Sequence, residues 1–152
     1  MREEGAFEKR IKADTVTALK GGDKGRVAAL RQLTAALKKA RIDANKEPSE
    51  ADELVVLKRE RKRRLEAIEI YEQAGRDELV ARESFEEGVL ATYLPEDLSE
   101  DDLGRLVDEA IAETGAQTPT DMGKVMGVVM KKVAGRADGT QVNRMVRARL
   151  GA

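Results

Sequence analysis

Glycines and cationic side chains recur at short intervals within residues 121–139, which read DMGKVMGVVMKKVAGRADG. At 100° per residue, the apolar residues of this segment fall on one helical face, and they are Met122, Val125, Met126, Val129 and Val133. Lys124 and Lys131, seven residues apart, share the opposite face. Gly123 and Gly127 lie on the shoulder between the two faces, where bare backbone allows a ligand to approach closely. The segment therefore indicates a helix with a packed underside and a cationic, low-profile outer surface.

The chemistry that suits such a surface is contact with phosphate groups. Gly135 stands where a helix commonly ends, so the basic residue after it lies just outside the helix. Residues 95–152 hold no aromatic side chain, so base stacking of the kind used on single strands is not expected there. Recognition of a folded RNA by its shape and phosphates fits better. The predicted contacts are Lys124, Lys131, Lys132, Arg136, Arg144 and Arg147, with Asn143 as a further polar contact.

A structural explanation of the same residues stays open at this point. Lysine and arginine near the C-terminal end of a helix also interact favourably with the helix dipole. Close packing of neighbouring helices is an equally good explanation of the two glycines. Composition alone favours neither interpretation.

The catalytic groups of most enzymes are missing from the sequence. The chain has no cysteine and no histidine, which removes thiolate chemistry, the usual general base and the commonest metal ligand. It has no nucleophile elbow, no phosphate-binding loop and no dinucleotide fingerprint. Of its three serines, Ser49 and Ser99 are better explained as helix caps. We therefore predict no catalytic residue, no metal and no cofactor, and do not expect the chain to be an enzyme on its own.

Charge is strongly segregated along the chain although its net value is only −1. Residues 20–46 carry eight Lys/Arg against two Asp/Glu, and residues 58–64 carry six against one. Residues 95–121 carry one Lys/Arg against nine Asp/Glu, whereas residues 122–152 carry seven against one. An anionic partner is compatible with this local field. The alternative is that acidic and basic helices pair with each other within the protein.

Hydrophobic residues spaced by threes and fours, few aromatics and three prolines indicate an all-α protein. In the first predicted helix, Phe7, Ile11, Ala18 and Leu19 are expected to point inward, and Leu65 is expected to do so in the third. In the basic block of the third helix, Arg61 falls on the apolar stripe and is expected to snorkel or pair with a carboxylate. The predicted helices span about 6–20, 24–44, 50–75, 77–94, 100–115, 121–134 and 140–150.

Local signals mark the predicted helix starts and one domain boundary. Asp23 is placed to cap the second helix, and the Ser49/Asp52 and Ser99/Asp102 spacings match capping boxes. Pro95 ends the fourth helix, and the composition turns acidic directly after it. We therefore expect a four-helix subdomain built on a long helical hairpin in residues 1–94 and a compact three-helix subdomain in residues 95–152.

No apolar run approaches the length of a membrane span, and the N-terminal MREEGAFEKR is too charged for a secretory signal. The expected location is the cytoplasm, with no membrane contact.

Four stretches of the sequence resemble the GatB/YqeY family, and specifically its free-standing YqeY-like members. They are DKGRVAALRQL, KRERKRRLEAIEIYEQAGR, YLPEDLSEDDL and, most specifically, DMGKVMGVVMKKVAGRADG. The last stretch is similar to the C-terminal tail of the B subunit of glutamine-dependent aminoacyl-tRNA amidotransferase.

This resemblance implies a multihelical fold whose C-terminal part helps to hold the body of a tRNA, while amidation occurs in domains that have no counterpart here. It implies tRNA, held at its elbow or body, as a partner, together with an amidotransferase or synthetase complex. Carbon–nitrogen ligase activity with glutamine as amide donor then describes an association and not a reaction of this chain. The alternative function is a protein–protein interaction module without RNA binding. Its acidic face in residues 95–121, which includes Glu100, Asp101 and Asp102, and its basic helices would then contact a partner.

Overall fold

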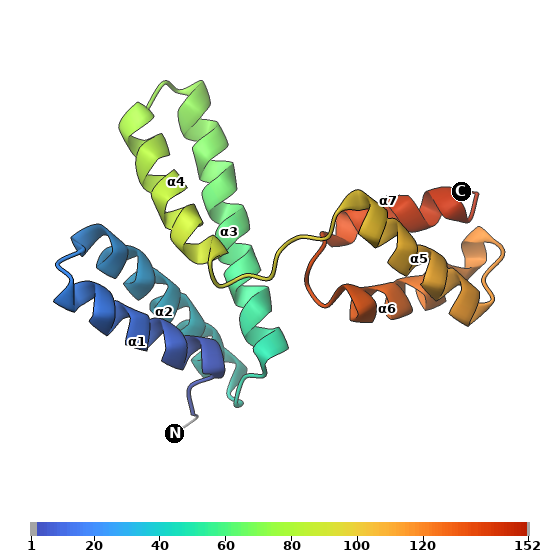
Figure 1. The fold of residues 1–152 in the computed structure, drawn as a ribbon, viewed down its shortest axis with the longest axis horizontal. Coiled ribbons are helices and arrows are strands. Elements are labelled where there is room, and N and C mark those ends of the chain that lie inside the picture. Colours follow the sequence, from blue (N-terminus) through green and yellow to red (C-terminus); the bar gives the residue numbers. More distant parts are fainter. Residues whose placement is uncertain (1–2, 152) are drawn as a thin grey trace. The chain divides into compact units, whose positions relative to one another are not determined.

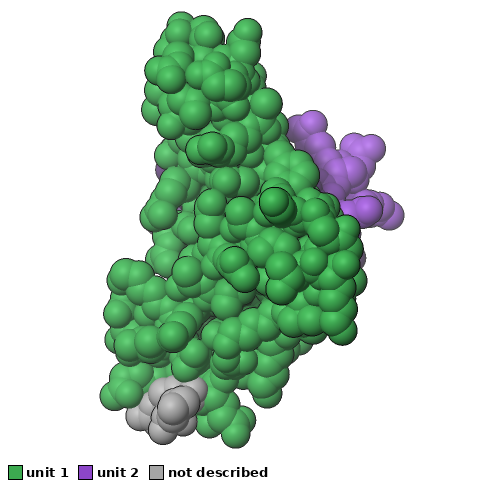
Figure 2. Space-filling model, turned by 90° about the vertical axis from the view of Figure 1, so that its left-hand side faces the viewer, with its two compact units in different colours: residues 1–94 green, residues 95–152 purple. Residues whose placement is uncertain are grey.

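The computed structural model describes residues 3–151, whose regular elements are all helices joined by turns and loops, with no strand among them (Figure 1). The expected all-α fold is confirmed. The elements are α1 Ala6–Lys20, α2 Lys24–Ala44, α3 Glu50–Gln73, α4 Asp77–Ala91, α5 Glu100–Thr114, the 3₁₀ turn η1 Pro119–Asp121, α6 Met122–Val133 and α7 Gly139–Arg149. They form two compact units, residues 1–94 and residues 95–152, which Figure 2 distinguishes by colour. None of the helices in residues 3–151 combines the length and the apolar character that crossing a bilayer requires.

The starts of α2, α3 and α5 are set by the caps that the sequence predicts. Asp23 Oδ1 accepts a hydrogen bond from the Arg26 amide at 3.0 Å. Ser49 Oγ accepts from the Asp52 amide at 3.1 Å, and the Asp52 carboxylate accepts from the Ser49 amide in return. Ser99 Oγ accepts from the Asp102 amide at 3.1 Å. These bonds satisfy amide groups that a helix start otherwise leaves unpaired.

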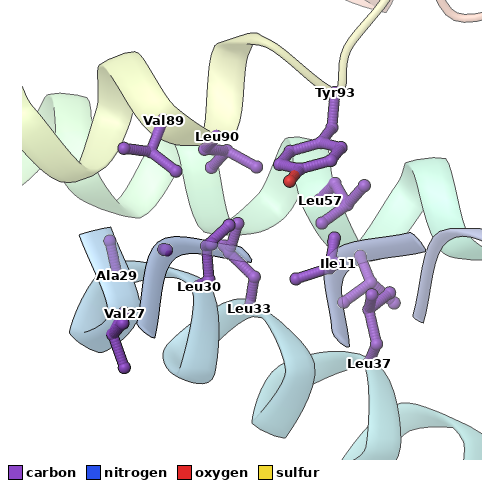
Figure 3. Packing of buried hydrophobic residues seen from close by; sticks show 12 residues of the cluster. Ile11, Val27, Ala29, Leu30, Leu33, Leu37, Leu57, Val89, Leu90 and Tyr93 are labelled. Atoms are coloured by element: carbon purple, nitrogen blue, oxygen red, sulfur yellow. The ribbon is translucent and has the colours of Figure 1, made fainter. Parts of the chain in front are cut away.

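The unit of residues 1–94 consists of two helical hairpins, α1–α2 and α3–α4, packed on a shared apolar core. Figure 3 shows side chains from all four helices meeting there, with Leu30 of α2 facing Leu90 of α4. The buried residues are Ile11, Ala18, Val27, Ala29, Leu30, Leu33, Leu37, Val56, Leu57, Val89, Leu90 and Tyr93.

Two predicted core residues are exposed, which corrects the sequence-based assignment. Leu19 is 59% exposed and Leu65 is 45% exposed. Leu65 begins a stretch of the α3–α4 hairpin, residues 65–88, in which no side chain is buried. Helix periodicity identifies an apolar stripe but not how much of it a neighbour covers, and here the stripe is wider than the cover. The fourth helix also ends at Ala91, three residues earlier than predicted.

A buried carboxylate from α3 caps α1. Glu53, 2% exposed, accepts hydrogen bonds from the amides of Phe7 and Glu8 at 3.0 Å each. The residue at the N-cap, Gly5, offers no side-chain cap, and a Cβ added there would lie 2.3 Å from the Glu53 carboxyl carbon. The charge of Glu53 also suits the positive end of the α1 dipole. Glu53 and Gly5 therefore form one fitted contact between α3 and the start of α1.

A second long-range ionic contact lies beside this cap. Glu8 is fully buried and receives two hydrogen bonds from the Arg41 guanidinium, from Nε at 3.0 Å and from Nη2 at 3.1 Å. This two-point geometry is the one that arginine favours with carboxylates. The pKa of Arg41 is raised, first by this hydrogen bond. The pair ties α1 to α2 in a fixed register.

The basic block of α3 is partly used for internal pairing. Arg61 Nε lies 3.0 Å from Glu87 Oε1 of α4, which confirms the predicted pairing with a carboxylate. Arg64 is buried and donates to Gln32 of α2 at 3.0 Å. Lys62 remains exposed. Part of the basic block therefore stabilises the packing of α3 against α2 and α4, and only the rest of its charge faces solvent.

Tyr93 is buried in the core of the four-helix unit, and its environment predicts that the unit loses stability at alkaline pH. Its hydroxyl donates to the Asp14 carboxylate, and the Arg10 guanidinium lies 4.9 Å from the ring centroid. Burial and the bond to Asp14 raise the pKa of Tyr93 to about 12. Because the folded-state pKa lies above the unfolded-state value near 10, this stabilisation is complete below pH 10 and is lost as the pH rises towards 12.

We expect Tyr93→Phe to flatten this alkaline loss. Urea unfolding followed by circular dichroism at pH 9, 10 and 11 measures the free energy of unfolding of both proteins. Lysine titration affects both equally, so their difference isolates Tyr93. Parallel pH profiles for the two proteins would contradict the assignment.

The unit of residues 95–152 is a three-helix assembly of α5, α6 and α7 with its own core. Its buried residues are Leu103, Val107, Ala110, Val125, Val129, Val133, Ala137, Val142, Val146 and Leu150. The turn before α6 is held by Asp121, whose carboxylate accepts from the amides of Gln117 at 3.0 Å and Thr118 at 3.3 Å. These backbone hydrogen bonds lower the pKa of Asp121. The carboxylate thus fixes where α6 begins.

Candidate nucleic-acid interface

Helix α6 turns its apolar side into the core and its glycines and lysines to solvent. Val125, Val129 and Val133 are fully buried. The exposed residues of α6 are Gly123, Lys124, Gly127, Met130 and Lys131. The predicted division of this helix into a packed and an open side is therefore observed.

The glycines of α6 face open space. A Cβ added to Gly123 or Gly127 would have no heavy atom within 4 Å, apart from the backbone of α6 itself. Close helix packing is thus not what these two glycines provide within residues 3–151. Bare backbone lies open along this side of α6, and glycine costs a helix stability wherever alanine would fit.

Lys132, one of the predicted contacts, is engaged with α5. Its Nζ lies 2.7 Å from Glu113 and 3.6 Å from Glu109, and its side chain is 25% exposed. The hydrogen bond to Glu113 is the main cause of its raised pKa. Arg149 of α7 pairs with Asp108 of the same acidic helix at 2.6 Å. Helix α5 therefore neutralises the cations that border it.

Arg136 has a structural contact as well. Its Nε donates to the carbonyl oxygen of Glu96 at 3.0 Å, and its own carbonyl oxygen accepts from the Leu98 amide at 2.8 Å. This pair of bonds fastens the segment before α5 to the turn after α6. The guanidinium remains exposed and charged, but it is held in place.

The remaining predicted cations are exposed and carry no ion pair with any of residues 3–151. They are Lys131 of α6 and Arg144 and Arg147 of α7. Lys124 is also exposed and interacts electrostatically with Asp121 at the start of its helix. Asn143 is half-buried. Four of the seven predicted side chains are therefore available as open cationic groups.

Met130 is a further exposed residue of α6 that is not among the contacts predicted from the sequence. It is 39% exposed, and its Cε lies 4.0 Å from where a Cβ of Gly139 would stand, so it borders the start of α7. Its position three residues after Gly127 places it on the open side of α6, which is the signal that could have found it. The open side of α6 thus combines two cations, an apolar side chain and exposed backbone, and α7 adds the exposed Arg144 and Arg147.

Comparison with known proteins assigns the family. A search of curated proteins found no match. The family model described as Yqey-like protein matches residues 8–150, nearly the whole length of the chain. The match covers both helical units and agrees with the resemblance carried by the glycine- and lysine-rich segment of α6. The chain therefore belongs to the YqeY-like family, the family of the GatB/YqeY domain.

Proposed function

We propose that this protein binds folded RNA, and tRNA in particular, through the open surface of α6 and α7. The surface is defined by Gly123, Lys124, Gly127, Met130, Lys131, Arg144 and Arg147. Its cations meet phosphates, and the exposed α6 backbone lets a sugar–phosphate chain come close. The protein then acts as a tRNA-holding partner of an aminoacyl-tRNA amidotransferase or synthetase and not as the catalyst.

The observation that carries the proposal is the contrast between the two sides of the three-helix unit. Cations next to α5 are paired with its carboxylates, whereas Lys131, Arg144 and Arg147 are exposed and make no such pair among residues 3–151. An unpaired group of cations is the electrostatic feature that phosphate binding needs. Membership of the YqeY-like family is compatible with this role, through the resemblance to the amidotransferase tail.

The test is a titration of labelled tRNA with the full chain at several salt concentrations. Four phosphate contacts predict a log–log slope of about −3.5, if the coefficient for duplex DNA carries over. Engagement of Lys132 and Arg136 as well would steepen the slope to about −5. We expect Lys131→Glu to weaken binding about tenfold, because reversal removes one contact and adds repulsion.

Lys62→Glu is the matched control, since it makes the same charge change at an exposed lysine of α3. Its affinity should stay within about twofold of the original protein. A salt-independent affinity, or equal losses in both variants, would refute the proposed surface. Purification from cytosol before and after ribonuclease then identifies the bound RNA.

A further inference from the structure

A second surface with exposed cations that form no ion pair lies on α2, in the unit of residues 1–94. Six exposed residues follow one another at alternating intervals of four and three, and they are Lys24, Ala28, Arg31, Ala35, Lys38 and Ile42, called here the α2 seam. This alternation places all six on one narrow stripe of the helix. It is the same spacing by which one helix packs along another in coiled coils. The buried stripe of α2, which includes Leu30, Leu33 and Leu37, is a different one.

The seam alternates cations with small or apolar residues and contains no acid. No Asp or Glu occurs between Lys24 and Ile42. Lys24, Arg31 and Lys38 form no ion pair with any part of the chain that the structure describes. Their neighbours off the seam behave differently, because Lys39 pairs with Asp43 and Arg41 pairs with Glu8. The three unpaired cations stand seven residues, or roughly 10 Å, apart along the helix.

An apolar hollow opens beside the first half of the seam. It has a volume of about 280 Å³, and its apolar lining comes from Leu19, Val27 and Ala28. Lys24 and Arg31 lie at the same hollow, together with Asp23, whose Oδ1 is occupied by the Arg26 amide. The hollow is large enough to take one or two aliphatic side chains.

The exposed apolar side chains of α1 lie at the end that forms this hollow. Leu19 is 59% exposed, and Val16, three residues earlier on the same side of α1, is 51% exposed. Ile42 at the far end of the seam is 57% exposed. Large apolar side chains grouped along unpaired cations are typical of a surface that another protein covers.

We propose that the α2 seam binds an acidic amphipathic helix of another protein. Carboxylates spaced seven residues apart on that helix pair with Lys24, Arg31 and Lys38. Leucine-like side chains between them lie against Ala28 and Ala35, where the small residues permit close approach, and one enters the hollow lined by Leu19. A nucleic acid would use the cations but would leave the hollow and the apolar side chains of α1 uncovered.

This inference is independent of the proposed RNA surface, because the seam belongs to residues 1–94 and α6–α7 to residues 95–152. The probe is a labelled 21-residue helical peptide with Glu and Leu alternating at the spacings of the seam and neutral polar residues elsewhere. A second peptide of the same composition has these residues in scrambled order. Fluorescence anisotropy with the full-length protein measures both affinities.

We expect the patterned peptide to bind at micromolar concentration and the scrambled peptide at least about tenfold more weakly, which corresponds to a loss of roughly 1.4 kcal/mol. Arg31→Glu, at the centre of the seam, should weaken the patterned peptide by about tenfold or more. Lys62→Glu, the same charge change on α3, should leave it within about twofold. Lys131→Glu should leave the affinity for the patterned peptide unchanged although it weakens tRNA binding.

The Ala35→Gln variant distinguishes binding of a docked helix from binding of a flexible polyanion. Glutamine is a good helix former that keeps the charge of the seam but blocks close approach, so we expect a several-fold loss of peptide affinity. Equal affinity for the two peptides, no binding of the patterned peptide at 100 µM, or tolerance of Arg31→Glu would each overturn the proposal. Loss of tRNA binding in the Arg31→Glu protein would also overturn the proposal, because it would assign the seam to RNA. Loss of self-association in the same variant would overturn it too, because it would assign the seam to a second copy of the protein.

Discussion

Replacing Glu53 with alanine is expected to lower the free energy of unfolding of residues 1–94 by about 3 kcal/mol. The change removes two hydrogen bonds from a buried carboxylate to the amides of Phe7 and Glu8, and it leaves those donors unpaired. It also removes a negative charge from the positive end of α1. Glu50→Ala is the control, because Glu50 lies in the same first turn of α3 but is exposed.

Tyrosine fluorescence during urea unfolding reports on this unit alone, since every aromatic residue lies between Phe7 and Tyr93. We expect Gly5→Ala to destabilise the protein by a similar amount, because the added Cβ would displace the Glu53 carboxylate from both amides. In the Glu53→Ala background the same glycine substitution should cost close to nothing. Additive effects of the two substitutions would show that Gly5 and Glu53 act independently, against the fitted contact described above.

The second large effect is expected at Gly123 and Gly127, where stability and RNA binding should change in opposite directions. Because a Cβ at either position meets open space, the Gly123→Ala/Gly127→Ala protein should gain about 1.5 kcal/mol of stability from helix propensity alone. If the RNA lies against the bare backbone, as proposed, its affinity should fall about tenfold. Hydrogen exchange of the α6 amides measures the first quantity, and the tRNA titration measures the second.

Gly88→Ala provides the matched control for the glycine pair. Gly88 lies inside α4, and a Cβ there also meets nothing within 4 Å. The substitution should stabilise the four-helix unit by about 0.8 kcal/mol and leave tRNA affinity unchanged. Unchanged affinity in the double alanine protein as well would show that the glycines of α6 are not an RNA contact.

The helices and their starts could be predicted because their causes are local. The side chains of Asp23, Ser49 and Ser99 cap amides only three residues away, and apolar spacing identifies each buried stripe. The same spacing predicts that Leu19 is in the core, but its exposure depends on which neighbour covers the end of α1, which spacing does not encode.

The partners of individual charges could not be predicted, because they depend on contacts between distant residues. Lys131 and Lys132 are adjacent in sequence and equally basic, yet only Lys132 reaches the carboxylates of α5. The cap that Glu53 supplies to α1 likewise joins residues 46 positions apart. The segregation of charge along the sequence predicts internal ion pairs or open charged surfaces. The fold determines which cations are paired and which are exposed.

The cap that Glu53 gives to α1 also bears on the order in which the chain folds during its synthesis. The first turn of α1 leaves the ribosome 46 residues before the side chain that satisfies its amides. Until α3 has been made, the buried carboxylate of Glu8 has Arg41 as a partner, but the amides of Phe7 and Glu8 depend on water. We therefore expect a nascent α1–α2 hairpin to be frayed at its start until α3 arrives and completes its first helix.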